Sequence, residues 1–122
     1  MTLQELYEKI GGDYEQAMRV LRMDKLLDKH IRKFANNDVV EKLINCENDF
    51  DPTVLFESSH AIKGVCANLG LTKISDTASD IAEEFRPGNE RKMSDDEVKE
   101  KIRYIADMYK LTVDSINEYV NQ

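Results

Sequence analysis

The sequence predicts an all-α protein, a bundle of helices around one core. In successive segments, apolar residues recur at spacings of three and four, which is the period of a helix face. Helix-capping signals precede several of these segments. The composition agrees with this fold class, because the 122 residues include only two prolines, five glycines and no tryptophan, and 34% of them are charged. No segment alternates apolar and polar residues in the manner of a half-buried strand.

The N-terminal part of the chain is predicted to form short helices. Thr2 and Glu5 have the spacing of a capping box, and a Gly-Gly pair ends the helix that they begin. The apolar pattern continues over residues 13–35. This pattern leaves open whether the segment is one helix or is broken near Asp24. Asp38 is the candidate N-cap of a further short amphipathic helix.

A helical hairpin is predicted in the middle of the chain. Asp51 followed by Pro52 is a strong start signal, because proline is favoured at the first position of a helix. We expect this helix to run to Leu69, with Gly70 as its C-terminal stop. Thr72 begins the next helix almost at once. So short a turn favours an antiparallel pair.

The last helix is predicted to be long. The chain breaks at residues 86–89, and Ser94 with Glu97 then forms a second candidate capping box. Apolar and small residues follow at spacings of four and three, the seam of a bundle helix: Val98, Ile102, Ile105, Tyr109, Thr112, Ile116 and Tyr119. We therefore expect one domain over residues 1–122, an antiparallel, up-and-down four-helix bundle with one or more extra short N-terminal helices.

Charge and composition argue against several classes of function. The formal net charge of −7 opposes binding to nucleic-acid phosphates and to anionic membrane surfaces. No apolar run approaches the roughly 20 residues of a membrane span, and the N-terminal residues lack the basic-then-apolar pattern of a signal segment. The expected compartment is the cytoplasm. Cys46 and Cys66 are too few for a disulfide framework, so both are expected to be reduced thiols.

One histidine lies on an unusual face of the predicted hairpin. On a helical wheel, one side of the segment is apolar and is expected to face the core: Leu55, Ile62, Cys66 and Leu69. His60 points almost opposite to this stripe. The outward face around it carries a mixed set of residues: Phe56, Glu57, Lys63, Gly64 and Ala67. A mid-helix glycine costs about 1 kcal/mol relative to alanine, and an exposed phenylalanine is equally unexpected. We therefore expect another molecule to approach this face closely.

The same face suits a reactive imidazole. A neutral imidazole is a competent nucleophile near neutral pH. Lys63 is one helical turn away and can offset the negative charge of a phosphoryl group on the ring. Gly64 removes the side chain that would obstruct an incoming active site, and Phe56 offers an apolar contact to a docking protein.

Residues 60–70 resemble the signature of histidine-containing phosphotransfer (HPt) domains. They read H-x-x-K-G-x-x-x-N-L-G. An apolar helix precedes this motif and a helix follows it directly, as in that family. The resemblance implies that His60 carries the phosphoryl group, usually on Nε2, and that Lys63 is its electrostatic partner. It further implies that Asn68, Leu69 and Gly70 define the end of the site helix and the turn into the next one.

The resulting hypothesis is a phosphoryl carrier without its own kinase machinery. The chain has no Gly-rich phosphate loop and no Walker lysine, so we expect no use of ATP. The partners would be response-regulator receiver domains, a hybrid histidine kinase, or both. The receiver would supply the aspartyl phosphate and a Mg²⁺ ion, while the carrier binds no cofactor. The carrier is expected to be a monomer, because a dimer built on the hairpin would bury the site.

Three alternatives stay open. The chain could dock receivers without accepting phosphate, although intact His60 and Lys63 oppose this. It could be the phosphotransfer part of a larger sensor kinase; the start at Met1 and the capped last helix favour a free-standing protein. A di-iron carboxylate site is the weakest alternative. Glu57 and His60 form one Glu-x-x-His, but the second copy is absent.

The remaining polar and sulfur-containing residues receive structural interpretations. His30 is expected to be solvated or to lie at the edge of the bundle, and Cys66 to be a buried structural thiol. The acidic residues of the hairpin's second helix are expected to be solvated: Asp76, Asp80, Glu83 and Glu84.

Overall fold

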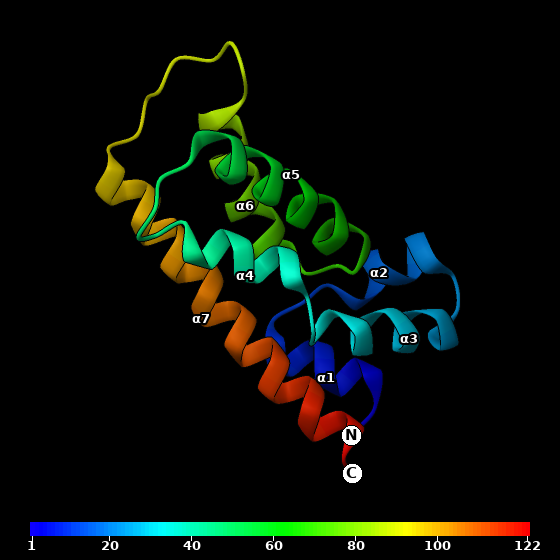
Figure 1. Ribbon diagram of the computed structural model, residues 1–122. Helices are drawn as coiled ribbons and strands as arrows, with labels where there is room; N and C mark the ends of the chain where they lie inside the picture. Colours follow the sequence, from blue (N-terminus) through cyan, green and yellow to red (C-terminus); the bar gives the residue numbers. More distant parts are fainter.

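The computed structural model describes all residues from Met1 to Gln122 and is entirely helical. Seven helices follow one another along the chain: α1 (Leu3–Ile10), α2 (Tyr14–Leu21), α3 (Asp24–Phe34), α4 (Asp38–Asn45), α5 (Pro52–Asn68), α6 (Thr72–Phe85) and α7 (Asp95–Val120). Helix α5 packs most extensively against α6, and this antiparallel hairpin lies beside the N-terminal half of α7 (Figure 1). The predicted all-α bundle fold is confirmed.

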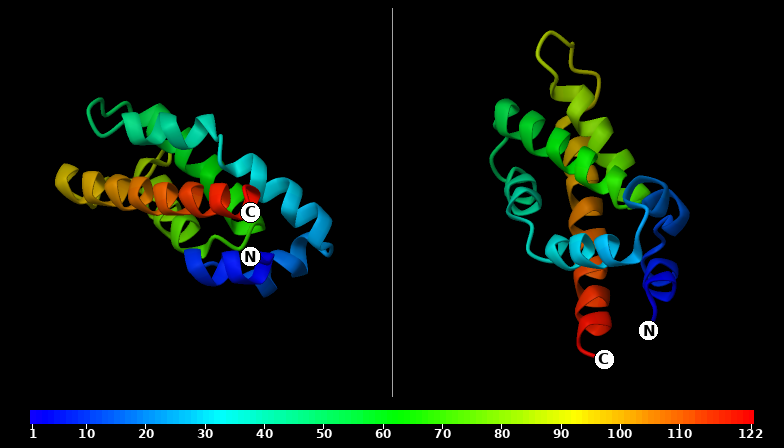
Figure 2. Two further views of the ribbon diagram at one scale, coloured as in Figure 1. Left: turned by 90° about the horizontal axis from the view of Figure 1, so that it is seen from below. Right: turned by 90° about the vertical axis from the view of Figure 1, so that its right-hand side faces the viewer.

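Helix α7 connects the two parts of the bundle. It contacts α1, α3, α4 and α6, so it joins the N-terminal helices to the hairpin. The further views show α7 running the length of the molecule, with the two chain ends close together at its C-terminal end (Figure 2). The seven residues predicted to form its seam face the core, and all but Tyr119 are buried.

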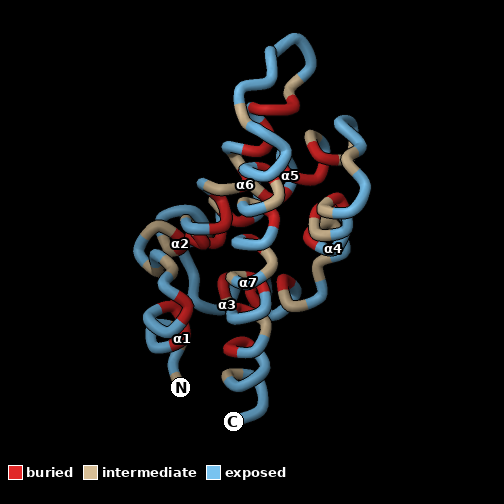
Figure 3. Tube along the Cα trace, turned by 90° about the vertical axis from the view of Figure 1, so that its left-hand side faces the viewer, coloured by how far each residue is buried: buried red, intermediate tan, exposed pale blue.

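One continuous core holds these helices together. It contains 24 buried apolar residues drawn from every helix, and the buried positions line the inner side of each one (Figure 3). Burial of this apolar surface is the main favourable term in the folding of such a domain.

The short helices settle one question that the sequence left open and correct one detail of the sequence analysis. Residues 13–35 are two helices, because the chain turns at Arg22, whose φ of +65° is left-handed. The N-cap of α4 is Asn37, not Asp38. The Asn37 side chain accepts hydrogen bonds from the backbone N–H groups of Val39 (3.0 Å) and Val40 (3.2 Å). Asp38 then occupies the first turn, where its charge complements the helix dipole.

The two predicted capping boxes differ. At Thr2 and Glu5 both reciprocal bonds are made, as predicted. At Ser94 only half of the box is present. The Ser94 hydroxyl accepts from the backbone N–H of Glu97 (3.1 Å), while the Glu97 carboxylate accepts from that same hydroxyl (3.4 Å) rather than from the Ser94 backbone.

Candidate functional site

Helix α5 begins where the sequence predicted. The Asp51 carboxylate accepts hydrogen bonds from the backbone N–H groups of Thr53 (3.0 Å) and Val54 (3.3 Å), and Pro52 occupies the first turn. This cap fixes the residue at which the helix begins.

The orientation of α5 follows from its apolar stripe. The four residues assigned to the core are all buried: Leu55, Ile62, Cys66 and Leu69. Burial raises the pKa of the Cys66 thiol to about 12, as expected for an inert structural cysteine. Ser58 and Ser59 are also buried, which sequence reasoning missed. Each donates its hydroxyl to the carbonyl four residues earlier, at 2.6 Å, and such a bond makes a buried serine tolerable in a helix.

His60 is exposed on the opposite side of α5. No hydrogen bond within the chain fixes its imidazole. Its aromatic neighbour is Phe56, one turn earlier, whose ring stacks on the imidazole with centroids 5.6 Å apart and planes 22° apart. The sequence predicted an exposed phenylalanine at this position, but Phe56 is half-buried and packs against the rim of the core.

Lys63 follows His60 by three residues on α5, one helical turn away. The side chain is half-buried and forms no ion pair within the chain. The positive charge of Lys63 acts on the carboxyl group of Glu83 in α6. A hydrogen bond from Arg86 lowers the pKa of the Glu83 carboxyl most, and the positive charge of Lys63 lowers it further. The Lys63 backbone is anchored separately, because the Ser75 hydroxyl donates to its carbonyl (3.1 Å).

The surroundings of His60 are open. A Cβ atom added to Gly64 would have no heavy atom within 4 Å outside its own helix turn. Glu57 is exposed, and Ala67 is half-buried. The structure therefore places His60, Lys63, Gly64 and the flanking residues on one accessible face of α5, while the roles assigned to them stay predictions.

The turn after α5 is held by backbone groups. The N–H of Leu71 donates to the carbonyl of Cys66 (2.8 Å), and the N–H of Gly70 donates to the carbonyl of Ala67 (3.2 Å). These two bonds form a Schellman motif, which requires a left-handed residue, and Gly70 has φ +68°. Asn68 ends the helix with an exposed side chain.

The same turn is hydrogen-bonded to residues of the N-terminal part of the chain. The hydroxyl of buried Tyr7 donates to the carbonyl of Leu69 (2.6 Å), and the N–H of Asp13 donates to the carbonyl of Gly70 (2.7 Å). Tyr7 was not singled out from the sequence. Its position on the apolar face of α1 indicates burial, but only the tertiary structure supplies its partner.

A protein-family model described as the Hpt domain matches residues 3–114. The chain belongs to the Hpt domain family. This confirms the resemblance and the assignment to histidine phosphotransfer in phosphorelay signalling. Hpt domains are phosphoryl carriers without kinase machinery. Comparisons with curated proteins and with solved structures gave no match.

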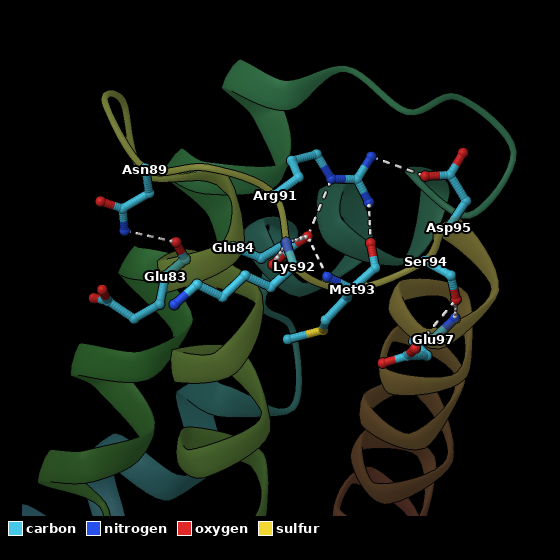
Figure 4. Close-up of polar contacts among 9 residues, drawn as sticks. All are labelled: Glu83, Glu84, Asn89, Arg91, Lys92, Met93, Ser94, Asp95 and Glu97. Atoms are coloured by element: carbon cyan, nitrogen blue, oxygen red, sulfur yellow. Dashed lines mark hydrogen bonds and ion pairs between the residues drawn. The ribbon is translucent and has the colours of Figure 1, made fainter.

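A buried carboxylate stabilises the α6–α7 loop of this Hpt domain, far along the chain from His60. Glu84 was expected to be solvated, but only 3% of its side chain is exposed. Its oxygens accept from the backbone N–H groups of Lys92 (3.0 Å) and Met93 (2.9 Å) and from Nε of Arg91 (3.1 Å), as Figure 4 shows. Arg91 also bonds Asp95 at 2.8 Å, which ties the loop to the start of α7. Burial requires such pairing, which the sequence pattern alone does not reveal.

The other polar predictions are settled by position. The remaining acidic residues of α6 are exposed as expected: Asp76, Asp80 and Glu83. His30 is exposed at the edge of the bundle, in a shallow pocket between α3 and the C-terminal end of α5.

No three His, Cys, Asp or Glu side chains lie close enough together to hold a metal ion. None of the helices has the combined length and apolar character needed to cross a bilayer.

Proposed function

We propose that this Hpt domain accepts a phosphoryl group on His60 from the phospho-aspartate of a receiver domain and passes it to the aspartate of another receiver. The observation that carries the proposal is an exposed imidazole on the same accessible face of α5 as a lysine without an ion pair and a glycine with open space around it. The family supplies the reaction class, and this geometry supports His60 as the residue that carries the phosphoryl group.

In the transfer step, the lone pair of Nε2 attacks phosphorus in line with the acyl-phosphate bond. The N–P bond forms as the P–O bond breaks, and the aspartate leaves as a carboxylate with the electron pair. The proton on Nδ1 stays in place, so the neutral imidazole becomes a phosphorylated imidazolium. Such transfer depends on positioning and charge stabilisation, and the carrier therefore needs few groups of its own.

Lys63 is proposed to stabilise the phosphoryl oxygens as charge develops. Its ammonium has no carboxylate partner to give up before it can pair with phosphate. The Mg²⁺ ion and the remaining catalytic electrostatics are proposed to come from the receiver. We expect Lys63→Met to slow transfer by about tenfold, a typical loss for one charge-assisted contact.

The test is transfer from a labelled, phosphorylated receiver to wild type and to His60→Gln side by side. Label on wild type alone, lost in acid and stable in base, would establish the phosphohistidine. No label from any of several receivers, with the protein shown to be folded and to bind them, would favour a docking module that carries no phosphate. Exchange in the cytoplasm between free-standing monomers is the proposed setting; the phosphotransfer part of a larger sensor kinase is the alternative.

A further inference from the structure

The imidazole of His60 has a neighbour that the proposed chemistry does not yet use. Phe56 lies four residues earlier on α5, where side chains of one helix face meet, and its ring stacks on the imidazole at 5.6 Å and 22°. Aromatic pairs favour such offset stacking at centroid distances of about 4.5–7 Å. The imidazole has no hydrogen bond within the chain, so no polar contact competes with this stack in orienting it.

Phe56 is itself held from the other helix of the hairpin. Helix α5 begins and α6 ends at the same end of the hairpin (Figure 1), which brings Arg86 to this ring. The Arg86 guanidinium lies over the Phe56 ring, 5.4 Å from its centroid. It is held there by Glu83, which accepts from Nη2 (2.8 Å) and Nε (3.1 Å) of Arg86.

We propose that Phe56 is a positioning residue that keeps the His60 imidazole in one rotamer, and that Arg86 extends this restraint to the end of α6. The inference rests on the proposed role of His60 as the phosphoryl acceptor. It differs from a docking role for Phe56, because positioning acts before any partner arrives. An exposed histidine otherwise samples several staggered χ1 states, and only some of them present Nε2 to an incoming phosphorus atom.

The first test measures rotamers without any phosphoryl transfer. The two Hα–Hβ couplings of His60 report its χ1 angle by nuclear magnetic resonance. Wild type and Phe56→Tyr, which both keep the ring, are expected to show the couplings of one rotamer. Phe56→Leu keeps the apolar bulk but removes the ring, so its couplings are expected to average. Arg86→Leu is expected to give partial averaging.

The second test separates positioning from docking. Phosphoramidate, a small phosphoryl donor, needs no protein interface. With this donor we expect phosphorylation of His60 to be up to about twofold slower in Phe56→Leu, the limit set by the two χ1 wells open to a residue within a helix, and unchanged in Phe56→Tyr. Val65→Ala, at another exposed apolar position of α5, is the matched control and is expected to react like wild type.

The outcomes distinguish this inference from the proposed function. Unchanged couplings and an unchanged phosphoramidate rate in Phe56→Leu, with slower transfer from a receiver, would overturn positioning and assign Phe56 to docking. Averaged couplings with slower phosphoramidate labelling would support it. If wild type accepts no label at His60 from either donor, the proposed function fails, and the couplings alone decide whether Phe56 orients the ring.

Discussion

The two glycines of the motif, Gly64 and Gly70, lie in opposite surroundings. Gly64 is in the middle of α5, and a Cβ there would meet nothing within 4 Å. Gly70 follows the end of α5 with φ +68°, and a Cβ there would lie 2.1 Å from the carbonyl oxygen of Asp13. One motif thus joins a surface that is kept clear to a turn that is packed against α1 and α2. Substitutions at the two glycines should therefore affect different quantities. A substitution of Gly70 should lower stability, and a substitution of Gly64 should slow phosphoryl transfer.

The largest expected effect is on stability, at the packed end. Gly70→Ala places a side chain in the left-handed region and against the Asp13 backbone, which must move and lose its bond to Gly70. We expect the free energy of unfolding to fall by about 2–5 kcal/mol, from left-handed strain plus the lost hydrogen bond. Urea denaturation measures this. A loss below about 1 kcal/mol, the size of an ordinary substitution, would show that the turn is less tightly packed than described.

A substitution of Gly64 is expected to change the rate of phosphoryl transfer instead. Gly64→Glu adds a bulky anion beside His60, and we expect transfer from a receiver to slow by about 100-fold, the cost of a small misplacement of reacting groups. Stability should not fall, because glutamate is the better helix former. Stopped-flow transfer and urea denaturation on the same sample measure both quantities.

Gly64→Ala is the matched control for that variant. It is expected to raise the free energy of unfolding by about 1 kcal/mol, since alanine replaces glycine in a helix interior with no steric contact. It should transfer far faster than Gly64→Glu. Equal transfer by Gly64→Glu and wild type would remove the steric role assigned to this glycine.

Tyr7→Phe tests the hydrogen bond that holds the turn after α5 to α1, without changing Gly70. It removes the hydroxyl that donates to the carbonyl of Leu69 and leaves that buried oxygen without its side-chain donor. We expect a loss of about 1–3 kcal/mol in the free energy of unfolding. Transfer at a temperature where the variant is folded should match wild type. A tenfold loss of transfer in the folded variant would mean that the turn also sets the geometry at His60.

Glu84→Gln tests the opposite end of the hairpin and is expected to cost about 1–2 kcal/mol at pH 7. Burial alone would raise the pKa of the Glu84 carboxyl, but hydrogen bonds from Lys92, Met93 and Arg91 outweigh it, so the pKa lies below the ordinary value of 4.5. A depressed pKa contributes stability above pH 4.5 that is lost as the pH falls through the folded value. The variant should therefore lose less stability than wild type in this acidic range. Parallel acid-denaturation curves for the two proteins would refute this.

Much of the fold and of the candidate site was predictable from local sequence. Asp51-Pro52 and the apolar stripe of α5 fix the start and the phase of that helix, and the phase alone places His60 outward. Thr2 with Glu5 predicted the first cap for the same local reason. Asn37 and Asp38 show the limit of such signals, because either residue can cap a helix and the chemistry of the pair does not choose between them.

Only the tertiary structure decided which groups come into contact when they lie far apart in the sequence. Glu84 shares the sequence pattern of its solvated neighbours on α6, and its burial depends on where residues 91–93 return. Tyr7 and Asp13 reach Leu69 and Gly70 across long sequence separations, and Arg86 reaches Phe56 only because α5 and α6 pair. Periodicity and caps are properties of one segment, so the sequence by itself determined the helices and the outward face of His60. Partners of buried and stacked groups depend on how the segments pack, and only the folded chain could supply them.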